Sequence, residues 1–450
     1  MPTCVLDTPA ACSRVHVLDL PARFNTALLH FAERQWGWGM LEHGPYGAQL
    51  PPPLPIGWHN TSDLALEPLL HRRAAMWHEP DPKAAAVVFA PYYAGLALRL
   101  LGSAAAAVLE QELLEQLGNS TAWTGAAPGR RLLALSVVAN EFAQQDWGSR
   151  LLLRPELAGV VVATIEARPG CNLVGAIGGN YGGRQIPSIP SRRACWGEEG
   201  VLQTAAWLVG VPYPPRSWHR EPALSLAKEL RCGDGADGSG EDEGIVGGEA
   251  RRPKLAAYIG STLHSHVTFY PLRHALATQC DADAARCAGG EFASAERLLA
   301  VYAEADFCVQ PPGDTATRRG IFDALSAGCV PVLLFREQLL GQYPHHLPAD
   351  PFDEDAGGAA LLLPEDARDS FLDFLAAVSP ARLATLRANA AAAAASLRYD
   401  VEPRAAGTPR EDGTPPDALE VLLSGICATS SGCGAESESG SSEVGTDTPA

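Results

Sequence analysis

Residues 310–334, QPPGDTATRRGIFDALSAGCVPVLL, decide the fold that this 450-residue sequence predicts. The run just before them, Phe307 to Val309, is short, apolar and followed by turn residues, which favours a buried strand. Two prolines, Gly313 and Asp314 then form a tight turn, because proline fixes φ and glycine permits a close backbone approach. The side chain of Asp314 can cap a helix that follows this turn.

A helix and a second strand are expected after the turn. Apolar residues recur at helical spacing over 315–327, Gly328 ends the helix, and the apolar run 330–334 is typical of a buried strand. Strand, turn, helix and strand in this order make a Rossmann-like unit. The free N–H groups at the start of such a helix bind phosphate, and the helix dipole adds to this attraction.

Four residues of this unit suit a nucleotide-sugar donor. Arg318 and Arg319 fall in the first helical turns, just after Thr317, where guanidinium groups match a diphosphate. Asp323 lies further along the same helix and could accept hydrogen bonds from ribose hydroxyls, although an acid on the helix surface is the alternative. The chain has neither GxxxxGKS/T nor GxGxxG at this turn, which excludes a P-loop NTPase and a dinucleotide fingerprint.

The longer stretch 307–334, FCVQPPGDTATRRGIFDALSAGCVPVLL, resembles the signature of the exostosin family of glycosyltransferases. The run 58–101 carries a helix, Asp-Pro, a strand and a Pro-Tyr-Tyr-Ala-Gly-Leu loop, and is similar to the plant xyloglucan galactosyltransferase-like branch of that family. The resemblance covers residues 12–400. It implies an α/β protein with two Rossmann-like domains facing a cleft, which is the GT-B type of glycosyltransferase architecture.

The length is too great for one core, and the composition changes along the chain. We expect an N-terminal acceptor-side domain over 12–230, a disordered acidic and Gly-rich insertion over 231–250, a nucleotide-sugar-binding domain over 251–402, and a disordered tail over 403–450. The Ala-rich run 380–398 predicts a long helix that crosses back under both domains.

By this resemblance the protein is an inverting hexosyltransferase. It would move a sugar, galactose or a related one, from a UDP-sugar to a polysaccharide or glycan hydroxyl in cell-wall or matrix synthesis. No metal cofactor is expected, because a helix N-terminus and two arginines would stabilise the diphosphate. The predicted donor-binding residues are Gly260, Gly313, Asp314, Thr317, Arg318, Arg319, Asp323 and Gly328.

Transfer also needs a group that takes the proton of the acceptor hydroxyl, and the first domain should supply it. Glu141 is the first candidate, because it follows a predicted strand and stands where the family has an aspartate. Asp146 is the second candidate. His43, His59 and His219 stay open as alternatives.

Two other functions stay open as well. Ser136-Val137 stands where the family has a Gly-Arg pair, so a non-catalytic paralogue that binds nucleotide-sugar or glycan is one alternative. A phosphorylase-like or nucleotide-binding enzyme on the same scaffold is the other, and it would take phosphate as its second substrate.

The composition restricts partners and compartment. A formal net charge of −18 argues against nucleic acid as a partner. Cys308 and Cys329 lie in apolar strands and are expected to be core residues, while Asp281-Ala282-Asp283 is expected to be a solvated loop and not a metal site. The family predicts the lumenal side of the Golgi membrane, with membrane contact only through an N-terminal anchor that is not visible in this sequence.

Overall fold

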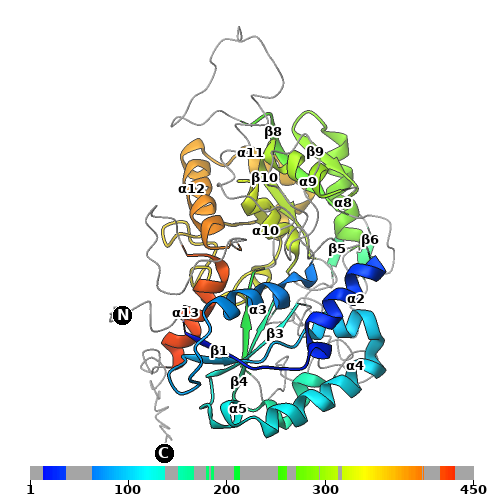
Figure 1. Ribbon diagram of the computed structural model, residues 1–450. Helices are drawn as coiled ribbons and strands as arrows, with labels where there is room; N and C mark the ends of the chain where they lie inside the picture. Colours follow the sequence, from blue (N-terminus) through cyan, green and yellow to red (C-terminus); the bar gives the residue numbers. More distant parts are fainter. Residues whose placement is uncertain are drawn as a thin grey trace, which may run out of the picture.

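A computed structural model gives the arrangement of much of the chain (Figure 1). The residues that it describes are 14–36, 63–136, 150–166, 179–181, 184–186, 207–212, 252–260, 270–292, 294–312, 317–397, 399 and 416–430. Several predictions fall outside these residues, namely those on Glu141, Asp146, Gly313, Asp314, the three loop histidines and the insertion 231–250.

The first part of the chain forms a parallel sheet with the strand order β1-β2-β3-β4-β7. Its strands therefore lie side by side in the order of the sequence. Their bounds are β1 Val15–Val17, β2 Val87–Phe89, β3 Arg131–Leu135, β4 Val160–Thr164 and β7 Trp207–Gly210. A separate antiparallel pair, β5 (Gly179–Tyr181) and β6 (Arg184–Ile186), lies outside this sheet.

The second part of the chain forms a parallel sheet with the order β12-β11-β10-β8-β9. Its strands are β8 Lys254–Ile259, β9 Cys287–Gly290, β10 Ala305–Gln310, β11 Val330–Leu333 and β12 Leu361–Leu362. The chain goes from β8 to β9 on one side and returns to β10 on the other side, which makes a doubly wound sheet. Two parallel α/β sheets confirm the predicted fold class, while the reversal of strand order is confined to the second one.

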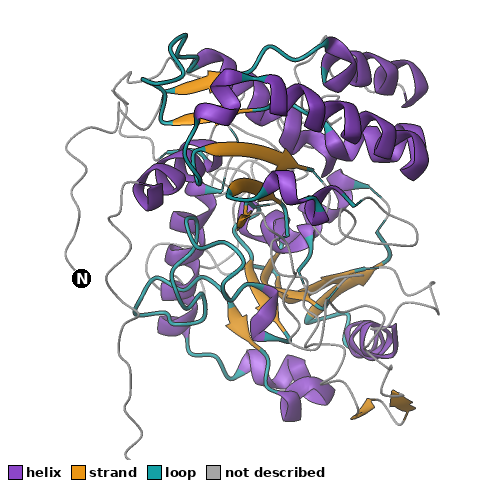
Figure 2. Cartoon of the chain, turned by 90° about the horizontal axis from the view of Figure 1, so that it is seen from below, coloured by secondary structure: helices purple, strands orange, loops and turns teal. Residues whose placement is uncertain are grey.

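Helices lie around both sheets (Figure 2). In the first part they are α2 Thr26–Trp36, α3 Leu66–Met76, α4 Ala94–Asn119 and α5 Thr121–Gly125. In the second part they are α8 Tyr270–Ala282, α9 Ala295–Ala303, α10 Arg319–Ser326, α11 Phe371–Ala376, α12 Pro380–Ser396 and α13 Ala418–Ser430. Short 3-10 helices span Ala22–Phe24, Asp63–Ala65, Leu151–Leu153, Pro155–Leu157, Arg336–Gln338 and Glu365–Ser370.

The first sheet is buried on both faces, which explains its continuous apolar strands. Val88 and Leu133 belong to the core on the side of α2 and α4. Phe89 and Leu132 belong to the core on the side of α3. Neighbouring residues of one strand point to opposite faces, so each strand needs apolar side chains at consecutive positions.

The two sheets belong to one packed body, because the core around α3 continues into the second part of the chain. Phe322 of α10 is a member of that core. Gly210, the last residue of β7, lies so close to Gln342 that a Cβ there would overlap the Gln342 carbonyl oxygen. The Tyr399 hydroxyl donates a hydrogen bond of 2.5 Å to the Pro212 carbonyl oxygen. The packing of the two domains is therefore fixed by backbone contact as well as by apolar side chains.

The prediction of a disordered tail over 403–450 is wrong for residues 418–430, which form α13. In Figure 1 this helix lies beside the first domain, and the buried Arg73 of α3 forms an ion pair with the buried Asp417. The tail is rich in Pro, Gly and Ser, and this composition hid a short apolar repeat at helical spacing. The buried residues of that repeat are Leu419, Leu422, Leu423 and Ile426. The predicted helix 380–398 is α12, and the chain returns to the first domain only after it.

Cys308 and Cys329 are buried core residues as predicted, and they also form a disulfide, which the sequence analysis did not anticipate. Residue 308 lies in β10 and residue 329 immediately precedes β11, so the pairing of these strands brings the two Cα atoms within 5.8 Å. A second disulfide joins Cys280 at the end of α8 to Cys287 at the start of β9. Strand neighbours cannot be known before the strand order is known, so sequence alone did not reveal the first pair.

Candidate active site

The strand order of the second sheet reverses between β8 and β10, and we name the carboxyl side of this point the β8–β10 crevice. In open α/β sheets, ligands bind at this point, outside the carboxyl ends of the strands. Gly260 follows β8, and Pro311 follows β10. The topology thus brings together the two glycine-bearing turns that the sequence predicts to hold a donor, although they are some 50 residues apart in the chain.

Helix α10 begins next to this crevice, at Arg319 and not at residue 315 as predicted. Arg318 is the N-cap residue with an extended backbone, and its Nη1 donates to the Pro311 carbonyl oxygen at 3.3 Å. Both arginines are partly buried. The first turn of α10 therefore presents cationic groups at the carboxyl edge of β10, where a diphosphate would lie.

Arg273 is a second cation at the crevice, and sequence reasoning missed it. It lies in the first turn of α8 and is buried. Its Nε and Nη2 atoms donate to the Pro312 carbonyl oxygen at 3.0 and 2.7 Å. This double hydrogen bond holds the start of the turn that leads from β10 to α10. A buried arginine bound to a backbone carbonyl leaves no periodic signal in the sequence.

Two further polar residues line the same strand ends. Gln310 is fully buried, and its Nε2 donates to the Tyr302 hydroxyl at 2.8 Å. A Cβ at Gly320 would overlap the Gln310 side-chain oxygen, so the glycine allows α10 to approach β10 closely. Tyr258 of β8 is buried as well, and its hydroxyl would lie 2.9 Å from a Cβ on Gly260.

Two predicted donor residues lie on α10 itself or at its end. Asp323 is fully buried, so the alternative of an acid on the helix surface is wrong. Gly328 has φ of 64°, a value that a residue with a side chain rarely adopts. It therefore ends the helix, as the sequence predicts, through its backbone conformation.

The first domain reaches this loop directly. Glu166, two residues after β4, is buried, and its Oε1 accepts a hydrogen bond of 3.0 Å from the Thr317 N–H. Nearby, the Tyr343 hydroxyl donates to the Ile165 carbonyl oxygen at 3.0 Å. The carboxyl edge of the first sheet therefore meets the predicted donor loop of the second. The Thr317 N–H is engaged by protein here and not turned towards solvent.

A second buried carboxyl of the first domain, that of Glu67, was also missed by the sequence analysis. Glu67 of α3 accepts hydrogen bonds at one oxygen from the N–H groups of Gly95 and Ser136, at 2.7 and 2.9 Å. Burial raises the pKa of Glu67 from 4.5 to about 8, against the smaller opposing effect of these hydrogen bonds. The Ser136 hydroxyl accepts from the Glu67 N–H at 3.1 Å. Ser136 thus has a structural partner at the place where the family carries a different residue pair.

The predicted catalytic residues Glu141 and Asp146 lie outside the described residues, in the segment 137–149 that begins after Ser136. Glu67 binds both Ser136 and Gly95. It therefore fixes the position of Ser136, the last described residue before this segment. In the sequence, the only sign of the Glu67 carboxyl is that an acidic residue stands inside the apolar run LALEPLL, residues 64–70.

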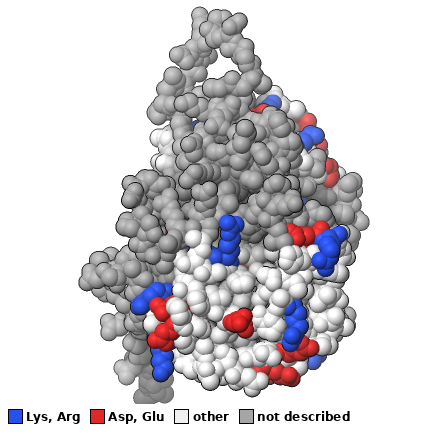
Figure 3. Space-filling view, viewed as in Figure 1, with Lys and Arg blue, Asp and Glu red and all other residues white. Residues whose placement is uncertain are grey.

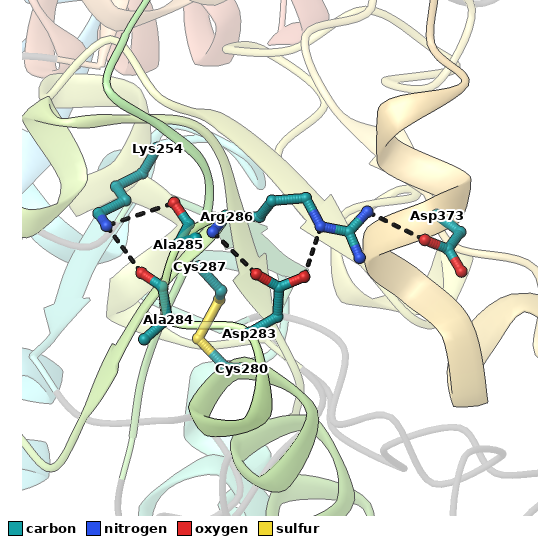
Figure 4. A network of polar contacts seen from close by, with 8 residues as sticks. All are labelled: Lys254, Cys280, Asp283, Ala284, Ala285, Arg286, Cys287 and Asp373. Carbon is teal, nitrogen blue, oxygen red and sulfur yellow. Dashed lines mark hydrogen bonds and ion pairs between the residues drawn. A yellow bond between two sulfur atoms is a disulfide. The ribbon is translucent and has the colours of Figure 1, made fainter.

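Asp281 and Ala282 are the last residues of α8 and do not lie in a loop as predicted, whereas Asp283 after them is bound by Arg286 (Figure 4). Asp283 accepts from Arg286 Nε at 2.6 Å, and Arg286 Nη1 donates to Asp373 at 3.0 Å. The hydrogen bonds that Arg286 donates to Asp283 lower the pKa of Asp283. Within the described part of the chain, three or more His, Cys, Asp or Glu side chains do not gather as metal ligands. The triplet thus belongs to an exposed ion-pair network beside the Cys280–Cys287 disulfide.

The surface around these elements carries both signs of charge. On the face in Figure 3, described basic and acidic side chains lie interspersed among uncharged ones. The cationic groups of the site, Arg273, Arg318 and Arg319, are buried or partly buried instead of forming an exposed patch.

Parts of the chain are similar to known proteins. Residues 242–371 match the model of the exostosin GT47 domain, which confirms the predicted resemblance over the second sheet. Xyloglucan-specific galacturonosyltransferase 1 of Arabidopsis thaliana is 25% identical over 361 residues, which cover 76% of this chain and 47% of the relative. A probable xyloglucan galactosyltransferase of the same plant, GT19, is 28% identical over 370 residues, covering 76% of this chain and 73% of the relative.

The chain thus spans less than half of the length of the first of these relatives. Among solved structures, the pneumococcal O-GlcNAc transferase GtfA in complex with UDP and GlcNAc is similar at 10% identity and a TM-score of 0.30. That similarity covers 64% of this chain and 56% of the other.

Proposed function

We propose, since residues 242–371 form an exostosin GT47 domain, that this chain is an inverting glycosyltransferase. Its donor would be a UDP-sugar with galactose or a related sugar. Its acceptor would be a hydroxyl of a cell-wall polysaccharide or another glycan. Both plant relatives are transferases named for xyloglucan, which supports this class of acceptor.

One observation carries the proposal: the strand-order reversal of the second sheet lies against the carboxyl edge of the first sheet. Gly260 and Pro311 mark the crevice, and Thr317 of the donor loop is held by Glu166 of the first domain. A donor bound at the crevice would present its sugar to an acceptor held by the first domain. Transfer requires this juxtaposition of the two substrates.

The leaving diphosphate would be stabilised by protein groups. The start of α10 offers Arg318 and Arg319, and its helix dipole is positive at this end. Charge that develops on the leaving oxygen in the transition state is stabilised by such fixed positive groups. We therefore propose that transfer needs no divalent cation.

The proton of the acceptor hydroxyl would go to a carboxylate of the segment 137–149. Glu141 is our first choice and Asp146 the second, because both follow β3 in the sequence and either carboxylate can accept a proton. Attack of that hydroxyl on the anomeric carbon, from the side opposite the diphosphate, would invert the configuration and release UDP.

We place this reaction in the lumen of the Golgi. The disulfides Cys280–Cys287 and Cys308–Cys329 support an oxidising compartment. Among the helices of the described residues, none has the length and apolar character that a membrane span requires.

Incubation of the protein with a panel of UDP-sugars and xyloglucan oligosaccharides tests the proposal. Mass spectrometry of the oligosaccharides should show one added hexose or hexuronic acid with one of the donors, and the new linkage should be β by NMR. UDP binding without transfer to any acceptor would favour the non-catalytic paralogue. Product formed only with inorganic phosphate as the second substrate would favour a phosphorylase.

A further inference from the structure

A buried hydroxyl without a hydrogen-bond partner lies at the crevice of the second sheet. It belongs to Tyr258, the residue before the last one of β8, and 1% of this residue is exposed. Among the described residues of the structure, the hydroxyl oxygen is buried and finds neither donor nor acceptor. Buried polar groups of folded proteins almost always have a partner, so an exception indicates a strained or functional position.

The position of this hydroxyl is defined by its neighbour in sequence. Gly260 follows β8 at the carboxyl edge, and a Cβ there would come within 2.9 Å of the Tyr258 oxygen and 3.2 Å of the ring carbon that bears it. The tyrosine therefore extends along its own strand to the edge where β8 and β10 separate. Glycine at 260 leaves room for this side chain, and a larger residue would displace it.

The charge around the hydroxyl is positive. Arg318 and Arg273 both lie close enough to lower its pKa, with smaller opposing effects from Tyr302 and Glu291. Desolvation is the largest effect, and it raises the pKa of Tyr258 to about 12. The hydroxyl therefore keeps its proton at neutral pH and can act as a hydrogen-bond donor.

Within the described residues, this neutral donor near Arg318 and Arg273 has no acceptor to bind. The ligand that such a site lacks is an anion with hydrogen-bond acceptors, because arginine and a hydroxyl both donate and neither guanidinium accepts. Phosphate oxygens meet this description. A ribose hydroxyl or a uracil ring would gain less, since neither carries the charge that Arg318 and Arg273 favour.

We propose that the Tyr258 hydroxyl donates a hydrogen bond to a phosphate oxygen of the donor's diphosphate at the β8–β10 crevice. This inference rests on the proposed function, and it adds a contact from β8 to the groups that α10 supplies. The diphosphate would then be held from both sides of the crevice. Tyr258 belongs to β8, and Arg318 follows β10. The unpaired hydroxyl would be a cost in stability that ligand binding removes.

The Tyr258→Phe variant tests this inference, because it removes one oxygen and keeps the ring in the core. We expect calorimetric UDP affinity to fall by about 10- to 100-fold, the range for a hydrogen bond to a charged group. The affinity for uridine, which lacks phosphate, should not change. The Tm of the variant should be equal to or higher than that of the wild-type protein, since it loses an unpaired buried hydroxyl.

Tyr93→Phe is the matched control. The Tyr93 hydroxyl is also buried, but it has a partner, His71 Nδ1, at 2.9 Å in the first domain. This variant should lower the Tm and leave UDP affinity unchanged. Tyr258→Phe should thus keep or raise the Tm and weaken UDP binding, whereas Tyr93→Phe should lower the Tm and leave UDP binding unchanged.

Four outcomes would overturn the inference. If wild-type protein and Tyr258→Phe bind UDP equally, the hydroxyl does not contact the diphosphate, and the proposed function still stands. If the variant loses affinity for uridine as much as for UDP, the contact is to the nucleoside. If wild-type protein does not bind UDP, the inference and the proposed function both fail. A lowered Tm in Tyr258→Phe would show that the hydroxyl has a structural partner.

Discussion

The buried carboxyl of Glu166 in the first domain accepts a hydrogen bond from the Thr317 N–H in the second. The oxygen and nitrogen are 3.0 Å apart, across 151 residues of sequence. Thr317 directly precedes the two arginines that cap and begin α10. The position of these cations thus depends on a side chain from the opposite domain.

Substitution of Glu166 should weaken both stability and donor binding. In Glu166→Ala the Thr317 N–H stays buried without its acceptor, which typically costs about 1–3 kcal/mol. We expect thermal denaturation to show a lower Tm, and calorimetry to show weaker UDP binding. Glu166→Gln retains an oxygen at this position, so its UDP affinity should lie closer to that of the wild type. Equal loss of affinity in both variants would argue against positioning of the donor loop.

Removal of a guanidinium at α10 should abolish the response to donor. UDP should raise the Tm of the wild-type protein, because a ligand that binds only the folded state stabilises it. Arg319→Ala should fold and lose this response. Arg382→Ala is the control, because Arg382 is an exposed residue of α12 that pairs with Glu354. A full UDP response in Arg319→Ala and in Arg318→Ala would place the diphosphate elsewhere.

Chelation of metal should leave the reaction unchanged. We expect equal rates of sugar transfer in excess EDTA and in manganese, because fixed cations stand at the diphosphate position. Asp283→Asn removes a carboxylate that pairs with Arg286, and it should keep full activity. Loss of activity in EDTA with recovery in manganese, together with an inactive Asp283→Asn variant, would instead assign a metal to the triplet.

The buried Glu67 should make stability fall as pH rises. Its pKa is raised to about 8 in the folded protein from an ordinary value of 4.5. Between these values only the folded state keeps the proton, so unfolding releases it and is favoured by higher pH. Glu67→Gln does not titrate and preserves the shape of the side chain. The Tm of Glu67→Gln relative to the wild type should therefore rise from pH 4.5 to 8 and level off above.

Glu141 should control the chemical step. Glu141→Gln keeps the shape of the side chain and removes its basicity, so kcat should fall about 10²- to 10⁴-fold with UDP affinity intact. The rate measurement should be paired with Asp146→Asn. Normal turnover in Glu141→Gln and loss of turnover in Asp146→Asn would transfer the role of base to Asp146.

Sequence predicted the parts of the fold that repeat a local pattern. The two strands and the helix around Arg318 follow from periodicity, and the structure contains them with the helix four residues shorter at its start. The predicted turn before the helix lies partly outside the described residues. Gly260 and Pro311 also proved to be neighbours, since both follow strands that pair in parallel. The unit around Arg318 depends on residues that are close in the sequence. The position of Gly260 next to Pro311 follows from the general rule that parallel strands end at the same edge of a sheet.

Other parts of the site depend on which distant segments meet. Arg273 and Glu67 form hydrogen bonds with residues far away in the sequence, and the Tyr258 hydroxyl is buried without one among the described residues. No spacing in the sequence predicts these features. The Cys308–Cys329 disulfide follows from strand neighbours, and α13 from a docking surface that only the folded chain provides. Sequence patterns describe an element alone, whereas these features belong to the packing between elements.

The Arg73–Asp417 ion pair links two residues that are 344 positions apart in the chain. Because the core around α3 includes side chains of α13, the first domain is completed by a segment that the ribosome makes long after α3. Contacts of such long sequence separation slow folding and leave apolar surface uncovered during synthesis. The emerging chain should therefore depend on chaperones until residue 430 has left the ribosome, and C-terminal truncations before α13 should accumulate as aggregates.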